Sequence, residues 1–212
     1  DVARDIKGKF PNIHCVVLTP FSHGITKRMQ NEDLSIFDYV FCWLGNTNLI
    51  LSIIKLIEDK MNLEHDIREA GVQMILLVED SIRFYSSILP NLYNYILEQS
   101  KNFSKEALNR HAATMRMRGR PKVVLARTYE EAKKLYDKYS NNTLGVISDA
   151  RFPLKSAAKA FGNEVEQEVK PEYGTDTFGR EKCPDAGLQL FRYIRKNDSF
   201  VPLILESSES DN

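Results

Sequence analysis

The sequence predicts an α/β fold in which helices cover both faces of a parallel sheet, giving three layers. Two observations favour this fold. Short apolar runs of strand length alternate with helical patterns along residues 72–212. These runs are apolar at successive positions, which is typical of strands buried on both faces. The clearest run ends at Asp149, and the chain then breaks at Pro153.

Residues 1–61 predict a helix, two strands and a second helix. A helical pattern covers residues 1–12, and the segments 14–20 and 39–43 are rich in β-forming residues. The next helix repeats apolar residues on one face, namely Leu49, Ile50, Ile53, Ile54, Ile57 and Met61. The polar segment 62–71 predicts a linker between this unit and the rest of the chain.

Residues 72–212 predict strands joined by helices. The expected strands are 74–78, 122–125, 144–149 and 203–205. A long helical pattern follows the first strand, and Pro90 should kink it or start a second helix. Thr128 and Glu131 form a capping box. The helix that this box starts is expected to bury Ala132, Leu135, Tyr136 and Tyr139.

Residues 154–184 interrupt this alternation. They are charged, contain glycine and lack a steady period, so we expect an inserted loop. A helix begins after the insert, and its spacing turns Leu188, Phe191 and Ile194 inward.

The composition excludes several classes of partner. The 212 residues contain 29 basic and 29 acidic side chains, so no overall field attracts nucleic acid or an anionic membrane. We interpret the basic cluster between Arg110 and Lys122 as a solvated helix end. The three cysteines are scattered and lack metal-ligand spacing, which is typical of a reduced, cytoplasmic protein. The four histidines are also scattered, so we do not expect a transition-metal site. The chain starts at Asp1 within a helical pattern, so we expect a piece of a longer polypeptide.

Polar residues follow three of the expected strands. Glu79 and Asp80 come after the first, Asp149 ends the third, and Ser207 follows the fourth. The carboxyl ends of parallel strands share one edge of a sheet, so these side chains should meet there. Paired carboxylates suit Mg²⁺, and a further aspartate could complete the site or attack phosphorus as a nucleophile. The sequence therefore predicts a magnesium site with a candidate phosphoacceptor.

Three segments resemble the receiver domain of two-component response regulators. Residues 77–81 are similar to its first-strand acidic pair, 149–153 to its Asp-x-x-Met-Pro motif, and 201–207 to its fourth strand. The resemblance implies a flavodoxin-like (CheY-like) fold for residues 72–212. It also implies that Asp149 accepts a phosphoryl group and that the Ser207 hydroxyl senses it. The Mg²⁺ ligands that it implies are Glu79, Asp80, Asp149 and the backbone carbonyl of Arg151.

The rest of the chain extends this resemblance and departs from it. Residues 1–61 look like the second half of a degenerate receiver. The receiver lysine on a fifth strand has no counterpart after Ser207. A degenerate copy followed by a fuller one resembles the tandem region before the kinase domain of phosphoenolpyruvate-synthase-like proteins. That likeness implies regulation of an attached, ATP-dependent phosphotransferase, or partnership with a cognate histidine kinase.

Two other functions fit the same residues. The first is a pseudo-receiver that is never phosphorylated and serves as a scaffold for homodimer formation or docking. A lysine in the acidic pocket would favour it. The second is an aspartate-nucleophile phosphatase of the haloacid-dehalogenase type. Its Asp-x-Asp motif requires an acid where this chain has Arg151, which disfavours that class.

Overall fold

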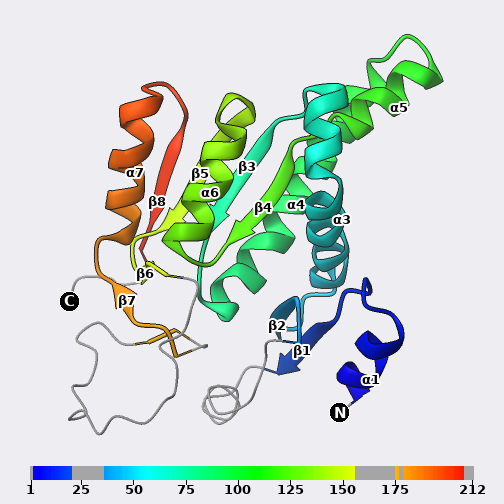
Figure 1. Cartoon of the computed structure of the whole chain (residues 1–212). Helices are drawn as coiled ribbons and strands as arrows, with labels where there is room; N and C mark the ends of the chain where they lie inside the picture. Colours follow the sequence, from blue (N-terminus) through cyan, green and yellow to red (C-terminus); the bar gives the residue numbers. More distant parts are fainter. Residues whose placement is uncertain (1, 21–35, 156–174, 177–178, 208–212) are drawn as a thin grey trace, which may run out of the picture.

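The computed structural model describes residues 2–20, 36–155, 175–176 and 179–207. A four-stranded parallel sheet lies at its centre, with the strand order β4-β3-β5-β8 (Figure 1). These strands are β3 (Met74–Val78), β4 (Lys122–Ala126), β5 (Thr143–Asp149) and β8 (Leu203–Glu206). The chain enters at β3, steps outward to β4, and then crosses back to β5 and β8. This order is that of flavodoxin-like folds, and it confirms the predicted α/β class.

Helices cover both faces of the sheet. Figure 1 shows α6 (Tyr129–Tyr139) and α7 (Ala186–Asn197) on one face and α4 (Ile82–Lys105) on the other. Successive strand residues point to opposite faces. Along β3, Leu76 packs in the core with α6 and α7, whereas Leu77 packs in the core with α4. The sheet is therefore the middle of three layers.

The capping box at the start of α6 forms in part. Thr128 Oγ1 accepts a hydrogen bond from the Glu131 N–H at 3.2 Å, as predicted. The Glu131 carboxylate accepts from the Arg127 N–H at 2.8 Å, one residue earlier than the usual return bond. The helix buries Ala132, Tyr136 and Tyr139, in agreement with the predicted face.

The segment 62–71, predicted as a linker between two units, is helical as far as Ala70. It forms the second half of α3 (Asn48–Ala70), which ends at Gly71 with a φ of 59°. The segment is polar because most of its side chains face solvent. Leu63 and Ile67 nevertheless pack into the core shared with α6 and α7. The division of the chain into two units at this segment stays a prediction.

The buried stripe of α3 also differs from the expected one. Ile50, Ile54 and Met61 are exposed. The residues that face the core are Leu49, Ser52, Ile53, Leu56, Asp59 and Leu63. Two of these are polar, so apolar spacing alone placed the face incorrectly. The same error affects α7, where Leu188 is 44 % exposed while Leu190 and Ile194 are fully buried.

Two helices lie between β3 and β4. The first, α4, continues through Pro90 to Lys105, and the second is α5 (Arg110–Arg118). The Asn109 side chain caps α5 by accepting a hydrogen bond from the Ala112 N–H at 2.9 Å. The second helix therefore begins at an asparagine cap rather than at the proline. Among the described residues, no helix combines the length and apolar character needed to cross a membrane.

A buried polar network joins α3, α4 and β4 at the amino end of the sheet. Asp59 accepts hydrogen bonds from the Tyr93 hydroxyl at 3.0 Å and from the Arg120 guanidinium at 2.6 and 3.0 Å. The Val123 N–H also donates to Asp59 at 2.9 Å. Lys122 pairs with Asp66 at 2.7 Å. Arg120 and Lys122 are therefore buried structural cations, which corrects their interpretation as part of a solvated helix end.

A smaller parallel pair precedes α3. It consists of β1 (Val16–Pro20) and β2 (Tyr39–Trp43), and α1 (Val2–Lys9) lies beside it (Figure 1). The pair is joined to α4 by hydrogen bonds: the Tyr85 hydroxyl donates to the Val40 carbonyl, and the Cys42 N–H donates to Ser86 Oγ at 2.9 Å. Consequently β2, α3, α4 and the sheet share one hydrophobic core.

Candidate functional site

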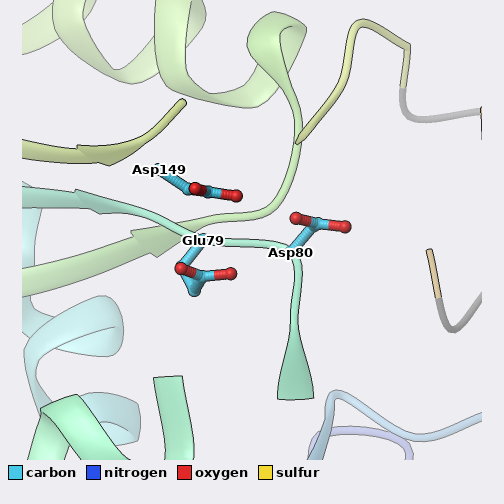
Figure 2. A group of neighbouring side chains, drawn as sticks. All are labelled: Glu79, Asp80 and Asp149. Atoms are coloured by element: carbon cyan, nitrogen blue, oxygen red, sulfur yellow. The ribbon is translucent and has the colours of Figure 1, made fainter. Parts of the chain in front are cut away.

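Three carboxylates meet at the carboxyl ends of β3 and β5. Glu79, Asp80 and Asp149 each offer an oxygen within 4.8 Å of the others, and Figure 2 shows them gathered at the strand ends. We call these three residues the acidic trio. From β3 the chain crosses to one side of the sheet, and from β5 it crosses to the other. The trio therefore lies at the topological switch point, where folds of this kind bind ligands.

Asp149 is fixed by the backbone that follows it. Its Oδ1 accepts a hydrogen bond from the Ala150 N–H at 2.7 Å. Burial raises the pKa of Asp149, and the backbone N–H groups of Ala150 and Arg151 oppose that rise. Asp149 is half-buried, which makes it the most accessible member of the acidic trio.

The first turn of α7 presses against the same backbone. The Gly187 N–H donates to the Ala150 carbonyl at 3.1 Å. A Cβ at position 187 would lie 2.4 Å from the Asp149 carbonyl oxygen and 2.8 Å from Leu205 Cδ1. Only glycine allows this approach. The end of β5 is thus held between α7 and β8.

Glu79 is almost completely buried, at 4 % exposure. Its backbone N–H donates to the Ala126 carbonyl at 3.0 Å, and its carboxylate accepts from the Ser81 N–H at 2.9 Å. Burial, followed by the nearby charge of Asp149, raises the pKa of Glu79 to about 8. At neutral pH this carboxyl group is therefore mostly protonated unless a cation approaches it.

Asp80 is fully buried and has a lysine as its partner. Lys182 Nζ donates to Asp80 Oδ1 at 3.1 Å and lies 2.8 Å from Oδ2. Within the described residues, Oδ2 has no hydrogen bond of its own and is paired with the ammonium only by charge. Burial raises the pKa of Asp80 to about 6, although Lys182 opposes the rise.

Lys182 was not predicted as a site residue. It lies in β7 (Lys182–Cys183), which pairs antiparallel with β6 (Phe152–Pro153). Residues 154–184 were expected to form an inserted loop, and most of them lie outside the described residues. The insert ends instead in a two-residue strand, and this strand places the Lys182 ammonium against Asp80 of the acidic trio. So short a strand carries no periodic sequence signal.

The remaining predicted site residues lie next to the trio. The β5–β8 register pairs Asp149 with Glu206, so Ser207 comes one position later, and its side chain is exposed. The Ala150 N–H donates to the Glu206 carbonyl at 3.0 Å, which brings the β8 end beside the Asp149 backbone. Arg151 is the next residue in the chain after Ala150. The role of the Ser207 hydroxyl and that of the Arg151 carbonyl stay predictions.

The acidic trio has the donor atoms and the charge for a divalent cation. Its donors are all carboxylate oxygens, which Mg²⁺ prefers, and opposite ligands of Mg²⁺ lie about 4.2 Å apart. Adjacent ligands lie about 3.0 Å apart, so the trio oxygens, which lie within 4.8 Å of one another, would move closer together to bind one ion. With all three acids ionised and Lys182 charged, the site carries a net charge of −2. The residues present therefore fit Mg²⁺.

Comparison with protein-family models, with curated proteins and with solved structures gave no match to this chain.

Proposed function

We propose that this chain is a receiver-like signalling module in which Asp149 is a Mg²⁺-dependent phosphoacceptor. The observation that carries the proposal is the acidic trio at the switch point between β3 and β5. A buried group of like charges is costly unless a cation neutralises it. When a cation approaches and all three acids are ionised, the net charge of −2 beside Lys182 would match one divalent ion.

The proposed reaction transfers a phosphoryl group to Asp149. One carboxylate oxygen of Asp149 attacks phosphorus of a small donor such as acetyl phosphate, and a P–O bond forms. The bond between phosphorus and the acetate oxygen breaks, and acetate leaves with the electron pair. Glu79, Asp80 and Asp149 would hold Mg²⁺, together with the carbonyl of Arg151. Bound there, the ion would neutralise charge on the phosphoryl oxygens.

The identity of the acceptor within the trio follows from access. Glu79 and Asp80 are 4 % and 0 % exposed, so an incoming phosphorus atom cannot reach them without displacing the surrounding chain. Asp149 is half-buried, and its carboxylate is oriented by backbone N–H groups. These properties favour Asp149 as the nucleophile and the other two acids as metal ligands.

We further propose that phosphorylation at Asp149 biases an attached, phosphoenolpyruvate-synthase-like kinase domain in the cytoplasm. The support is the resemblance of residues 1–61 and 72–212 to a degenerate receiver followed by a fuller one. Ser207, beside the end of β5, would carry the signal to the surface. A histidine kinase that recognises this surface is the corresponding phosphodonor.

The proposal is tested by incubating the chain with acetyl phosphate and Mg²⁺ and measuring its intact mass. We expect the wild-type chain to gain one phosphoryl group and Asp149→Asn to gain none. Asp137→Asn is the matched control, because Asp137 is a surface aspartate on α6. It should be labelled like the wild type. A wild-type chain that stays unmodified under conditions that label a known receiver would overturn the proposal.

The ion pair between Lys182 and Asp80 favours a second candidate, a scaffold that is never phosphorylated. In that case Lys182 already stabilises the acids, and no metal is needed. The scaffold predicts that Mg²⁺ leaves the melting temperature unchanged and that Asp149→Asn leaves the oligomeric state unchanged. A Mg²⁺-dependent rise in melting temperature that Asp149→Asn abolishes would exclude it.

A further inference from the structure

Lys182 belongs to the insert, yet its ammonium group reaches the fully buried Asp80. The Lys182 side chain is only 22 % exposed. It is carried on β7, whose pairing partner β6 begins three residues after Asp149. In the register of this pair, Lys182 lies opposite Pro153. Through this pairing, the Lys182 side chain is held next to the segment that directly follows Asp149.

The described residues just before β7, 175–176 and 179–181, are hydrogen-bonded to one another. Arg180 donates to the Asp176 carboxylate from its backbone N–H at 2.8 Å and from Nε at 2.7 Å. The Asp176 N–H donates to the Arg180 carbonyl at 2.9 Å, and Thr175 and Glu181 form an antiparallel bridge. Both members of the Asp176–Arg180 pair are buried. Lys182 therefore directly follows residues that are fixed by hydrogen bonds and an ion pair.

The charges of the site change when a phosphoryl group is added. Three carboxylates, one divalent ion and the Lys182 ammonium together are neutral. Phosphorylation replaces the single charge of Asp149 with about −1.5 to −2 on the phosphoryl oxygens. A divalent ion at Asp80 would compete with the lysine for the carboxylate. The displaced Lys182 ammonium and the phosphoryl group on Asp149 would then both lie at the carboxyl ends of β3 and β5.

Resting on the proposed function, we propose that Lys182 is the anion-binding residue of this site. It neutralises Asp80 until a divalent cation takes that carboxylate, and it then contacts an oxygen of the phosphoryl group on Asp149. The insert, through its last residues, is in this way part of the binding site. Loss of the ammonium should therefore strengthen cation binding and weaken anion binding.

The test compares Lys182→Ala, Lys182→Arg and the wild type by titration calorimetry. Lys155→Ala is the control, because Lys155 is an exposed lysine at the start of the same insert. The probes are Mg²⁺ alone and then beryllofluoride, a phosphoryl mimic, in saturating Mg²⁺. For Lys182→Ala we expect Mg²⁺ affinity to rise several-fold. Beryllofluoride affinity should fall about ten- to a hundredfold, the value of one charge-assisted hydrogen bond. Lys182→Arg should retain most of it.

The two titrations separate this inference from the proposed function. If the wild type binds neither Mg²⁺ nor beryllofluoride, the proposed function is wrong and the role of Lys182 is wrong with it. If the wild type binds both, but Lys182→Ala weakens both or changes neither, only the role of Lys182 is wrong. If Lys182 had only a structural role, Lys182→Ala would weaken the binding of both Mg²⁺ and beryllofluoride, because the substitution would disturb the whole site.

Discussion

At the scale of single residues, burial sets the protonation of Glu79. Its pKa rises from an ordinary value of 4.5 to about 8, and burial is the largest cause. The folded chain thus holds a proton that the unfolded chain releases above pH 4.5. Folding is favoured by that proton at acidic pH, and the advantage is lost as pH rises toward 8.

We therefore expect the free energy of unfolding, measured by urea titration in metal-free buffer, to decrease between pH 5 and pH 8. One proton contributes a slope of about −1.4 kcal/mol per pH unit at most. Glu79→Gln has no proton to release and should remove most of the slope above pH 6, where Asp80, with a pKa of about 6, is already ionised. A wild-type chain whose stability is flat between pH 6 and pH 8 would show that the pKa of Glu79 is not raised.

The acidic trio could be predicted because strand ends are readable in the sequence. Glu79, Asp80 and Asp149 each stand where an apolar run stops, and parallel strands bring such positions together. Lys182 could not be predicted in this way. Its place depends on the pairing of β7 with β6. That pairing is a contact between short segments separated by the insert, and it has no local pattern.

At the scale of elements, Asp59 links α3 to α4 and β4 through hydrogen bonds. This fully buried carboxylate accepts hydrogen bonds from Tyr93, Arg120 and the Val123 backbone. Its removal would leave the Arg120 guanidinium buried without its main partner. Loss of one member of a buried ion pair costs about 3–5 kcal/mol.

Accordingly, Asp59→Ala should lower the free energy of unfolding in urea by about 3–5 kcal/mol. Glu64→Ala is the matched control on the same helix. Glu64 also pairs with a lysine, Lys138, but at the surface. Its loss should have a much smaller effect, because solvent screens an exposed ion pair. Equal effects of the two substitutions would contradict the structural role of Asp59.

The helix α3 also shows where element prediction fails. Its length was missed because residues 62–70 are polar, and a polar helical face resembles a linker in sequence. Its buried stripe was misplaced because Ser52 and Asp59 belong to that stripe. A polar side chain can be buried when its partners are supplied by distant elements, here Arg120 for Asp59. Local periodicity does not contain those partners.

At the scale of the whole molecule, one core extends across the predicted boundary between the two units. Phe41 and Leu56 pack in the same cluster as Tyr85, Leu89 and Leu125. Such a core should unfold in one step, although residues 1–61 and 72–212 were predicted as separate units.

Trp43, the single tryptophan, reports on the first unit, whereas far-ultraviolet circular dichroism reports on the helices of both. We expect the two signals to follow one coincident transition in urea. Asp59→Ala should shift both midpoints together. A tryptophan transition that precedes the loss of helix would show that the first unit unfolds independently.

The order of the central sheet was within reach of sequence reasoning, and the position of the smaller sheet was not. Alternating strands and helices with right-handed crossovers leave few arrangements for β3, β4, β5 and β8. The β1–β2 pair is positioned by α4, through contacts such as that of Cys42 with Ser86. Contacts of this kind depend on side-chain packing, which the pattern of apolar residues does not specify.

The contact of Gly187 with the end of β5 makes α7 a mechanical neighbour of the acidic trio. At position 187 the helix approaches the Asp149 carbonyl so closely that even a methyl group would not fit. Atoms packed this tightly cannot absorb a displacement by compression. A change that moves the Asp149 backbone toward α7 must therefore also move the amino end of that helix, part of which is exposed at the surface.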